Sequence, residues 1–152
     1  MKRWQERSLW IVGTIIVMYA MVYGDVMLRA RSAYREGEKY WQWADHPELK
    51  ANYLNAQYAK EKTRLDDQLS AGKILKDDYD RSLELAQFDR EQGLKESSIK
   101  YAYVWYQTAV ELFSPPDSKW VELSRAKMPL AKERWKAELR AKGIPFEDYM
   151  ID

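Results

Sequence analysis

The side chains whose types and spacing could support chemistry are few, and the densest group is acidic. Asp77, Asp78 and Asp80 flank Tyr79, and clustered carboxylates are the ligands that calcium prefers. A calcium loop of the EF-hand type needs glycine at its sixth position, where Leu83 stands if Asp78 is the first. Carboxylates are also favoured in the first turn of a helix, where the amides lack partners. We therefore interpret the cluster as a helix N-terminus and predict no metal-binding residues.

Composition removes most other side-chain chemistry. The 152 residues include one histidine and no cysteine, so disulfide frameworks, Fe–S clusters, thiolate zinc sites and cysteine nucleophiles are excluded. His46 lies next to a proline and has no second imidazole for a metal and no clear nucleophile for a triad. Phosphate loops and dinucleotide fingerprints are absent. We therefore expect a non-catalytic protein with no catalytic residues, no cofactor and no small-molecule substrate.

The charge balance argues against a nucleic-acid partner. There are 25 basic and 24 acidic residues and no long basic run, whereas binding to phosphates requires clustered Lys and Arg. The mean hydropathy is −0.67 although 46% of the residues are hydrophobic, so the apolar residues must be concentrated in particular segments.

The main apolar concentration is residues 8–24, which contain no charged side chain. As a helix this stretch is about 25 Å long, and Val26, Met27 and Leu28 extend it toward the ~30 Å of a hydrocarbon core. We predict a basic tail over residues 1–8 and a transmembrane anchor helix over residues 9–28. Aromatic side chains are favoured at both membrane interfaces, and the residues predicted to lie there are Trp4 and Trp10 at one side and Tyr19 and Tyr23 at the other.

Two interpretations of this segment compete. A secretory signal peptide also has a basic start and an apolar region, and Val22-Tyr23-Gly24 is a tolerable though poor cleavage site. We favour an uncleaved signal anchor, which makes the chain a single-pass membrane protein. Basic residues flank both ends, so the positive-inside rule does not decide the orientation. The export-like start favours a cytoplasmic N-terminus and an extracytoplasmic helical domain.

Small residues recur along one face of the predicted anchor. Gly13, Ala20 and Gly24 are separated by seven and four positions, and such a stripe allows another membrane helix to approach closely. The alternative is that glycine and alanine are simply common in membrane helices. We predict that this face packs against integral membrane protein subunits in the lipid bilayer.

The remainder reads as an all-α chain, with helical periodicity and no clear strand pattern. We predict a juxtamembrane helix extension over residues 29–44, a helical domain of about four helices over residues 45–144, and an acidic tail over residues 145–152. Asp45 and Glu48 fit a capping box around Pro47. Gly72 is suited to end the first hairpin helix, and the fourth helix is predicted over residues 94–113.

Two local patterns resemble known helical families. Residues 65–79 resemble the hairpin of SHOCT-type domains, which implies two helices joined at Gly72. The second pattern is similar to the junction between tetratricopeptide repeats, and it comprises Ala102, Tyr106, Ala109, Trp120 and Leu123. Pro115 lies one place later than that repeat requires, and Asp89, Arg90 and Gly93 stand where the repeat has Leu, Gly and Tyr. The resemblance therefore implies helical-hairpin packing, not a repeat array.

The aromatic content suggests contacts with other proteins. The chain has seven Trp and eleven Tyr, residue types that are favoured at interfaces. The predicted partner contacts are Trp41, Trp43, Tyr101, Tyr103 and Trp105. The alternative for any of them is an ordinary core position.

Together these features predict a non-catalytic accessory or scaffolding subunit of a larger membrane complex. An energy-transducing assembly, respiratory or photosynthetic, is a host suggested by general frequency alone. The alternative is a membrane-tethered helical adaptor that recruits a soluble partner.

Overall fold

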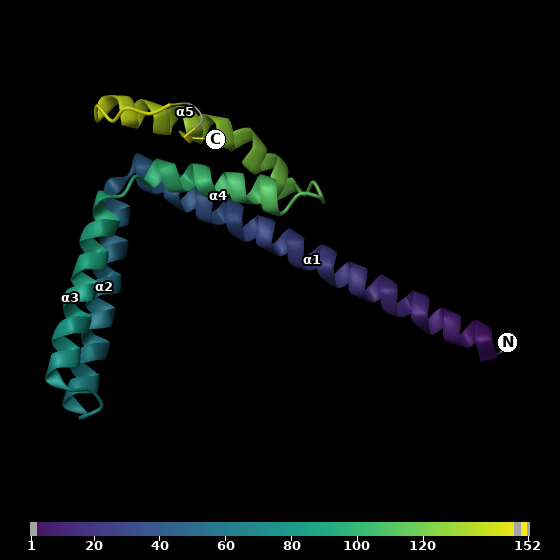
Figure 1. Cartoon of the computed structure of the whole chain (residues 1–152), viewed down its shortest axis with the longest axis horizontal. Coiled ribbons are helices and arrows are strands. Elements are labelled where there is room, and N and C mark those ends of the chain that lie inside the picture. The colour runs from purple at the N-terminus through teal and green to yellow at the C-terminus, as the bar shows by residue number, and fades with distance from the viewer. Residues whose placement is uncertain (1–2, 148–149, 152) are drawn as a thin grey trace. The chain divides into compact units, whose positions relative to one another are not determined.

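The fold is described from a computed structural model, which covers residues 3–147 and 150–151. The described residues form five α-helices and contain no strand (Figure 1). The helices are α1 (Arg3–Asp45), α2 (Pro47–Ser70), α3 (Lys76–Lys95), α4 (Ser98–Leu112) and α5 (Lys119–Ala141). The all-α prediction and the approximate number of helices are confirmed.

The helices form two compact units. Unit 1 contains the chain up to Lys39 and from Ile99 onward, and unit 2 contains residues 40–98. The helical domain expected over residues 45–144 stays a prediction. The helix α1 continues without a break past the predicted membrane segment, and its residues up to Lys39 belong to unit 1 and the rest to unit 2.

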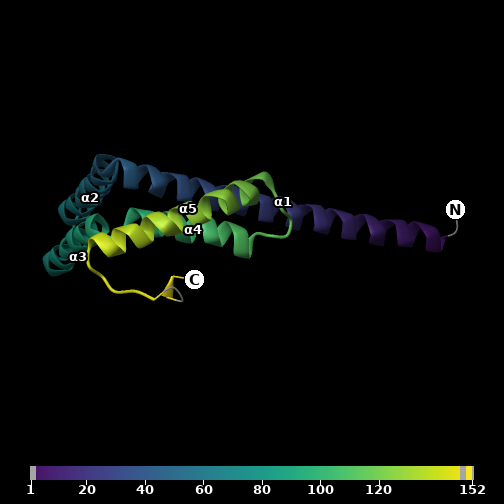
Figure 2. The ribbon, with the colours of Figure 1, turned by 90° about the horizontal axis from the view of Figure 1, so that it is seen from above.

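Unit 1 is built on a face of small residues on α1. Ala30, Ala33 and Gly37 are spaced by three and four positions and therefore lie on one helical face. Ala30 and Ala33 are buried, as is Tyr106 of α4, and a Cβ added to Gly37 would lie 2.5 Å from Cε1 of Tyr106. In two perpendicular views α4 lies along α1 (Figures 1 and 2), and Trp120 and Lys127 of α5 contact Tyr34 and Glu38 of α1. The lack of a side chain at Gly37 admits the ring of Tyr106.

Unit 2 is mainly the hairpin of α2 and α3. Gly72 adopts a positive φ of 65° between the two helices, as the sequence predicts, because a residue without Cβ enters that region without strain. A Cβ on Gly93 of α3 would lie 3.1 Å from Leu54 of α2, so this glycine also marks a close approach. Leu65 is buried, whereas no residue of α3 is.

Three helix boundaries differ from the sequence predictions. Asp45 is the last residue of α1, and His46 is the N-cap of α2 without a side-chain cap, so the capping box at Asp45 is wrong. A linker of one residue leaves Asp45 inside the preceding helix. The start of α4 is Ser98, not residue 94, because α3 continues to Lys95 and the Nζ of Lys50 donates a 2.6 Å hydrogen bond to the carbonyl of Glu96.

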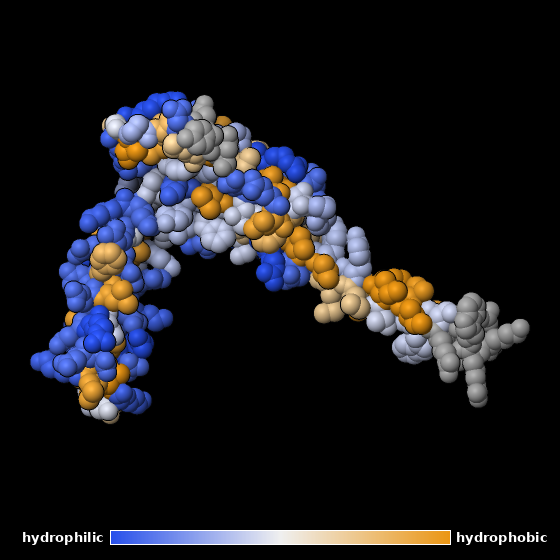
Figure 3. All heavy atoms as spheres, viewed as in Figure 1, coloured by the Kyte–Doolittle hydropathy of each residue, from blue (hydrophilic) through white to orange (hydrophobic). Residues whose placement is uncertain are grey.

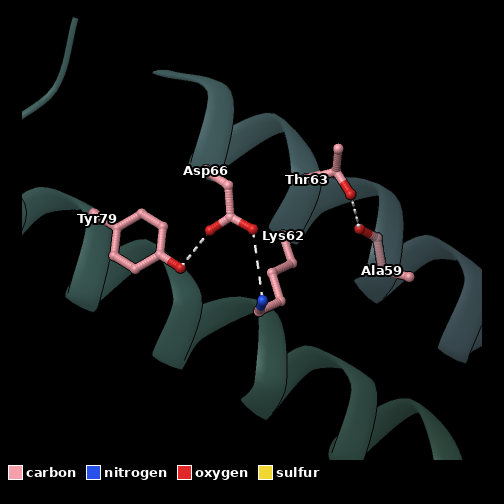
Figure 4. Close-up of polar contacts among 5 residues, drawn as sticks. All are labelled: Ala59, Lys62, Thr63, Asp66 and Tyr79. Atoms are coloured by element: carbon pink, nitrogen blue, oxygen red, sulfur yellow. Dashed lines mark hydrogen bonds and ion pairs between the residues drawn. The ribbon is translucent and has the colours of Figure 1, made fainter. Parts of the chain in front are cut away.

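A polar contact across the hairpin makes unit 2 sensitive to acid. The Tyr79 hydroxyl donates a 2.7 Å hydrogen bond to Asp66, and the Nζ of Lys62 lies 3.5 Å from the same carboxylate (Figure 4). The hydrogen bond from Tyr79, assisted by Lys62, lowers the pKa of Asp66 below its ordinary value. Because its pKa is lower in the folded state, ionised Asp66 stabilises the fold at pH values above its unfolded-state pKa of about 3.9. This contribution is lost as the pH falls through the pKa of Asp66 in the folded state.

Replacement of Asp66 with Asn is therefore expected to destabilise the hairpin at pH 7, and this effect should shrink as the pH falls through the lowered pKa of Asp66. Thermal unfolding followed at the amide NMR signals of α2 and α3 measures this difference. Parallel pH profiles for the wild type and the D66N variant would contradict the role given to this carboxylate.

Candidate functional site

The N-terminal half of α1 has large apolar side chains without cover. Within the described part of the chain, one helix is long and apolar enough to span a membrane, and it lies near the N-terminus. Neither view shows another helix beside this half of α1, and apolar atoms lie along it (Figure 3). The exposed large apolar residues of the predicted anchor are Leu9, Trp10, Ile11, Val12, Ile15, Ile16, Val17, Met18, Tyr19, Met21, Val22, Tyr23 and Leu28.

The predicted interfacial aromatic residues are spread along this part of α1, and Tyr19 lies near the middle of residues 9–28. Trp4 belongs to α1, but its side chain is outside the described residues. Nineteen positions of helix separate Trp4 from Tyr23, an axial distance of about 28 Å. Trp10, Tyr19 and Tyr23 are exposed, and the rings of the two tyrosines lie 6.5 Å apart. The helix therefore presents these rings to its surroundings at separate levels.

The stripe of small residues on this segment is uncovered. A Cβ added to Gly13 or to Gly24 would have no described atom within 4 Å apart from the helix itself. Ala20 is exposed on the same face. The stripe therefore has the open surface that packing against another helix requires, and that packing stays a prediction.

The five predicted partner-contact aromatics are distributed over both units. Trp43 is buried against Tyr53, with ring centroids 5.1 Å apart. Tyr103 is buried beside Trp135, and its hydroxyl donates a 3.0 Å hydrogen bond to the carbonyl of Ile151. The half-buried members are Trp41, Tyr101 and Trp105. Packing within this chain thus accounts for most of the surface of Trp43 and Tyr103, and contact of all five with a partner stays untested.

A polar cluster in unit 1, which the sequence analysis did not identify, joins its three helices. Glu38 of α1 accepts 2.5 Å contacts from the Tyr106 hydroxyl of α4 and from the Nζ of Lys127 of α5. The Tyr34 ring lies 6.0 Å from that of Tyr106 and 5.6 Å from that of Trp120. Burial, followed by the interaction with Glu38, raises the pKa of Tyr106. The spacing of Tyr34 and Glu38 by four positions is the one signal in the sequence.

Loss of this cluster is expected to destabilise unit 1. The Tyr106→Phe change removes a buried hydrogen bond to a carboxylate and should cost about 1.5–3 kcal/mol of unfolding free energy. The Glu38→Leu change should cost more, because it also leaves Tyr106 and Lys127 without this acceptor. Chemical unfolding measures both, with Tyr79→Phe as a control at a half-buried tyrosine whose hydroxyl also donates to a carboxylate. Equal effects of the Tyr106 and Tyr79 changes would contradict the importance of burial.

The described residues offer little that resembles a catalytic or metal site. Among them, no three His, Asp or Glu side chains are grouped so that they could hold a metal ion. A hollow between α2 and α3 is lined by both apolar and charged side chains. Of the charged ones, Arg64 pairs with Glu61 and Arg90 lies 5.4 Å above the ring of Tyr58. The exposed segment of α1 is therefore the principal candidate site.

No family model, curated protein or solved structure matches the chain. Its function is therefore inferred from its own packing and exposed surfaces.

Proposed function

We propose that the protein is a non-catalytic, single-pass accessory or scaffolding subunit of a larger membrane complex. The observation that carries this proposal is the contrast along α1. Residues 9–23 expose their large apolar side chains, whereas Ala30 and Ala33 are buried by packing within unit 1. A patch of this size is costly in water, and a bilayer or neighbouring membrane helices remove that cost.

The proposed partners are integral membrane protein subunits together with the surrounding lipid. Lipid tails are as apolar as the side chains of the segment, so helices associate in a bilayer through close packing. The open stripe of Gly13, Ala20 and Gly24 supports such an approach. We propose that the N-terminus is cytoplasmic and that the helical part of the chain beyond the anchor is extracytoplasmic, following the basic, export-like start of the chain.

Purification in a mild detergent followed by mass spectrometry tests the proposal. Integral membrane proteins are expected to co-purify in fixed stoichiometry. Recovery of the wild-type protein without such companions would contradict a subunit role.

Bulky residues on the small-residue stripe are expected to release these companions. The Gly13→Leu/Ala20→Leu variant should lower their recovery by about tenfold or more, which corresponds to about 1.4 kcal/mol. Ile15 and Val22 lie on the opposite face, so Ile15→Phe/Val22→Phe is a control that adds volume elsewhere in the same segment. Equal recovery with the two double variants would show that the stripe is not the packing face.

A second candidate function is that of a membrane-tethered adaptor for a soluble partner. The observation that favours it is the outer side of α3, where Leu85 and Phe88 are spaced by three positions and both are exposed. A companion that is water-soluble and is released by salt would support the adaptor and disfavour the membrane subunit.

A further inference from the structure

The turn between α4 and α5, residues 113–118, lies at the level of α1 where the apolar segment ends. In both ribbon views α4 runs along α1 toward the N-terminal half of α1 (Figures 1 and 2). Tyr106 packs against Gly37, and Leu112 is six residues further along, about 9 Å nearer the N-terminus of α1. Leu112 is therefore level with about residue 31.

Contacts of α5 independently place the other end of the turn beside the same part of α1. The ring of Trp120, which follows the turn, lies 5.6 Å from the ring of Tyr34. The guanidinium carbon of Arg31 also lies 5.6 Å from the centre of the Trp120 ring. Both ends of the turn are thus beside the first turns of α1 after the predicted anchor.

Burial along α1 shows how far this cover extends. Large side chains are exposed up to Tyr23, and Leu28 is exposed as well. Val26 and Met27 are half-buried and Ala30 is fully buried, so the cover lies over one face of the helix. Val26 and Met27 belong to the predicted anchor, so the cover of unit 1 reaches its last turn.

We propose that this turn is a second membrane contact, with Leu112 and Phe113 in the headgroup layer of the bilayer that α1 spans. The inference depends on the membrane anchoring proposed above. Arg31 is three residues, or about 4.5 Å, beyond Leu28, and each headgroup layer is about 5–8 Å thick. A side chain level with Arg31 therefore lies within that layer.

The side chains of the turn suit this environment. Leu112 is 70% exposed, Phe113 and Trp120 are half-buried, and Pro115 is exposed. Apolar and aromatic groups gain free energy when they enter the interface. Charges near the turn are balanced between four basic and four acidic residues, namely Arg29, Arg31, Lys119 and Arg125 against Asp25, Glu111, Asp117 and Glu122. The contact should therefore form on zwitterionic lipid and need no anionic headgroup.

Single cysteines provide the test, because the chain has none of its own. The full-length protein carrying Leu112→Cys is labelled with a nitroxide in phosphatidylcholine nanodiscs, and its collisions with oxygen and with a water-soluble nickel chelate are compared. Leu130→Cys is the matched control. Leu130 is also exposed, at 57%. It lies one turn after Lys127, which pairs with Glu38. Glu38 is ten residues, or about 15 Å, past Leu28, so Leu130 is expected to lie in water. Ile16→Cys reports on the anchor itself.

The Leu112 label is expected to collide with oxygen severalfold more, relative to nickel, than the Leu130 label. An aqueous Leu112 label together with a lipid-embedded Ile16 label would overturn this inference and leave the anchor intact. An aqueous Ile16 label would instead contradict the proposed function. If circular dichroism shows that L112C has lost helix, P115C in the same turn takes its place, with the same two outcomes.

Discussion

Arginines at Ile15 and Ile16 are expected to release the protein from membranes. Both side chains lie near the middle of the apolar segment, and they are 60% and 62% exposed. One arginine at the centre of a spanning helix costs about 2.5–3.5 kcal/mol, so two should cost about 5–7 kcal/mol. This exceeds what the remaining apolar residues of a short span can readily offset. The measurement is the fraction of protein that stays in membranes after washing with alkaline carbonate.

A matched variant separates anchoring from a general effect of charge. Leu85 and Phe88 of α3 are exposed to a similar extent, at 59% and 54%, but they lie outside the apolar segment. Replacement of both with arginine should leave the membrane fraction unchanged. Retention of the Ile15→Arg/Ile16→Arg variant in washed membranes, or equal release of the two double variants, would show that residues 9–28 do not anchor the chain.

The Gly37→Ala change is expected to destabilise unit 1 by about 1–2 kcal/mol. The added Cβ would lie 2.5 Å from Cε1 of Tyr106, and that ring cannot easily retreat because it is fully buried and its hydroxyl is bonded to Glu38. Overpacking of this kind costs about 1–3 kcal/mol, and the better helix propensity of alanine recovers up to about 1 kcal/mol. Thermal unfolding of the detergent-solubilised protein measures the net change.

Two other glycines provide graded controls. At Gly93 the nearest atom to an added Cβ is a Leu54 methyl at 3.1 Å, and at Gly24 no described atom lies within 4 Å. The Gly93→Ala change should be nearly neutral, because the end of a leucine side chain can shift. The Gly24→Ala change should not destabilise the protein. A Gly37→Ala variant as stable as either control would show that α1 and α4 do not depend on this close contact.

Local signals in the sequence were sufficient for much of the fold. The uncharged run of residues 8–24 identified the apolar helix, and Gly72 identified the hairpin turn, because each feature depends on neighbouring residues. Helical periodicity identified the all-α class for the same reason. The stripe on the apolar segment and the predicted partner aromatics remain predictions, since they concern surfaces that another molecule would cover.

Features that depend on contacts between residues far apart in the sequence could not be predicted from such local signals. Glu38 appeared to be one carboxylate among 24 acidic residues, and only the approach of Tyr106 and Lys127 gives it a structural role. The role of Gly37 is likewise defined by a ring 69 positions away, that of Tyr106. The division into two units depends on which later helices pack along α1, and helix periodicity does not specify partners.

The uninterrupted course of α1 has a mechanical consequence. From residue 9 to Lys39 the helix has no proline and no break. If this helix spans a bilayer as proposed, the part of unit 1 outside the lipid therefore has no joint about which it could swivel. A thinner bilayer or a neighbouring subunit could change the tilt of the spanning part of α1. Such a change would rotate Glu38, Tyr106 and Lys127 through the same angle. In the proposed membrane arrangement, the tilt of α4 and α5 relative to the lipid surface would thus follow the tilt of the spanning part of α1.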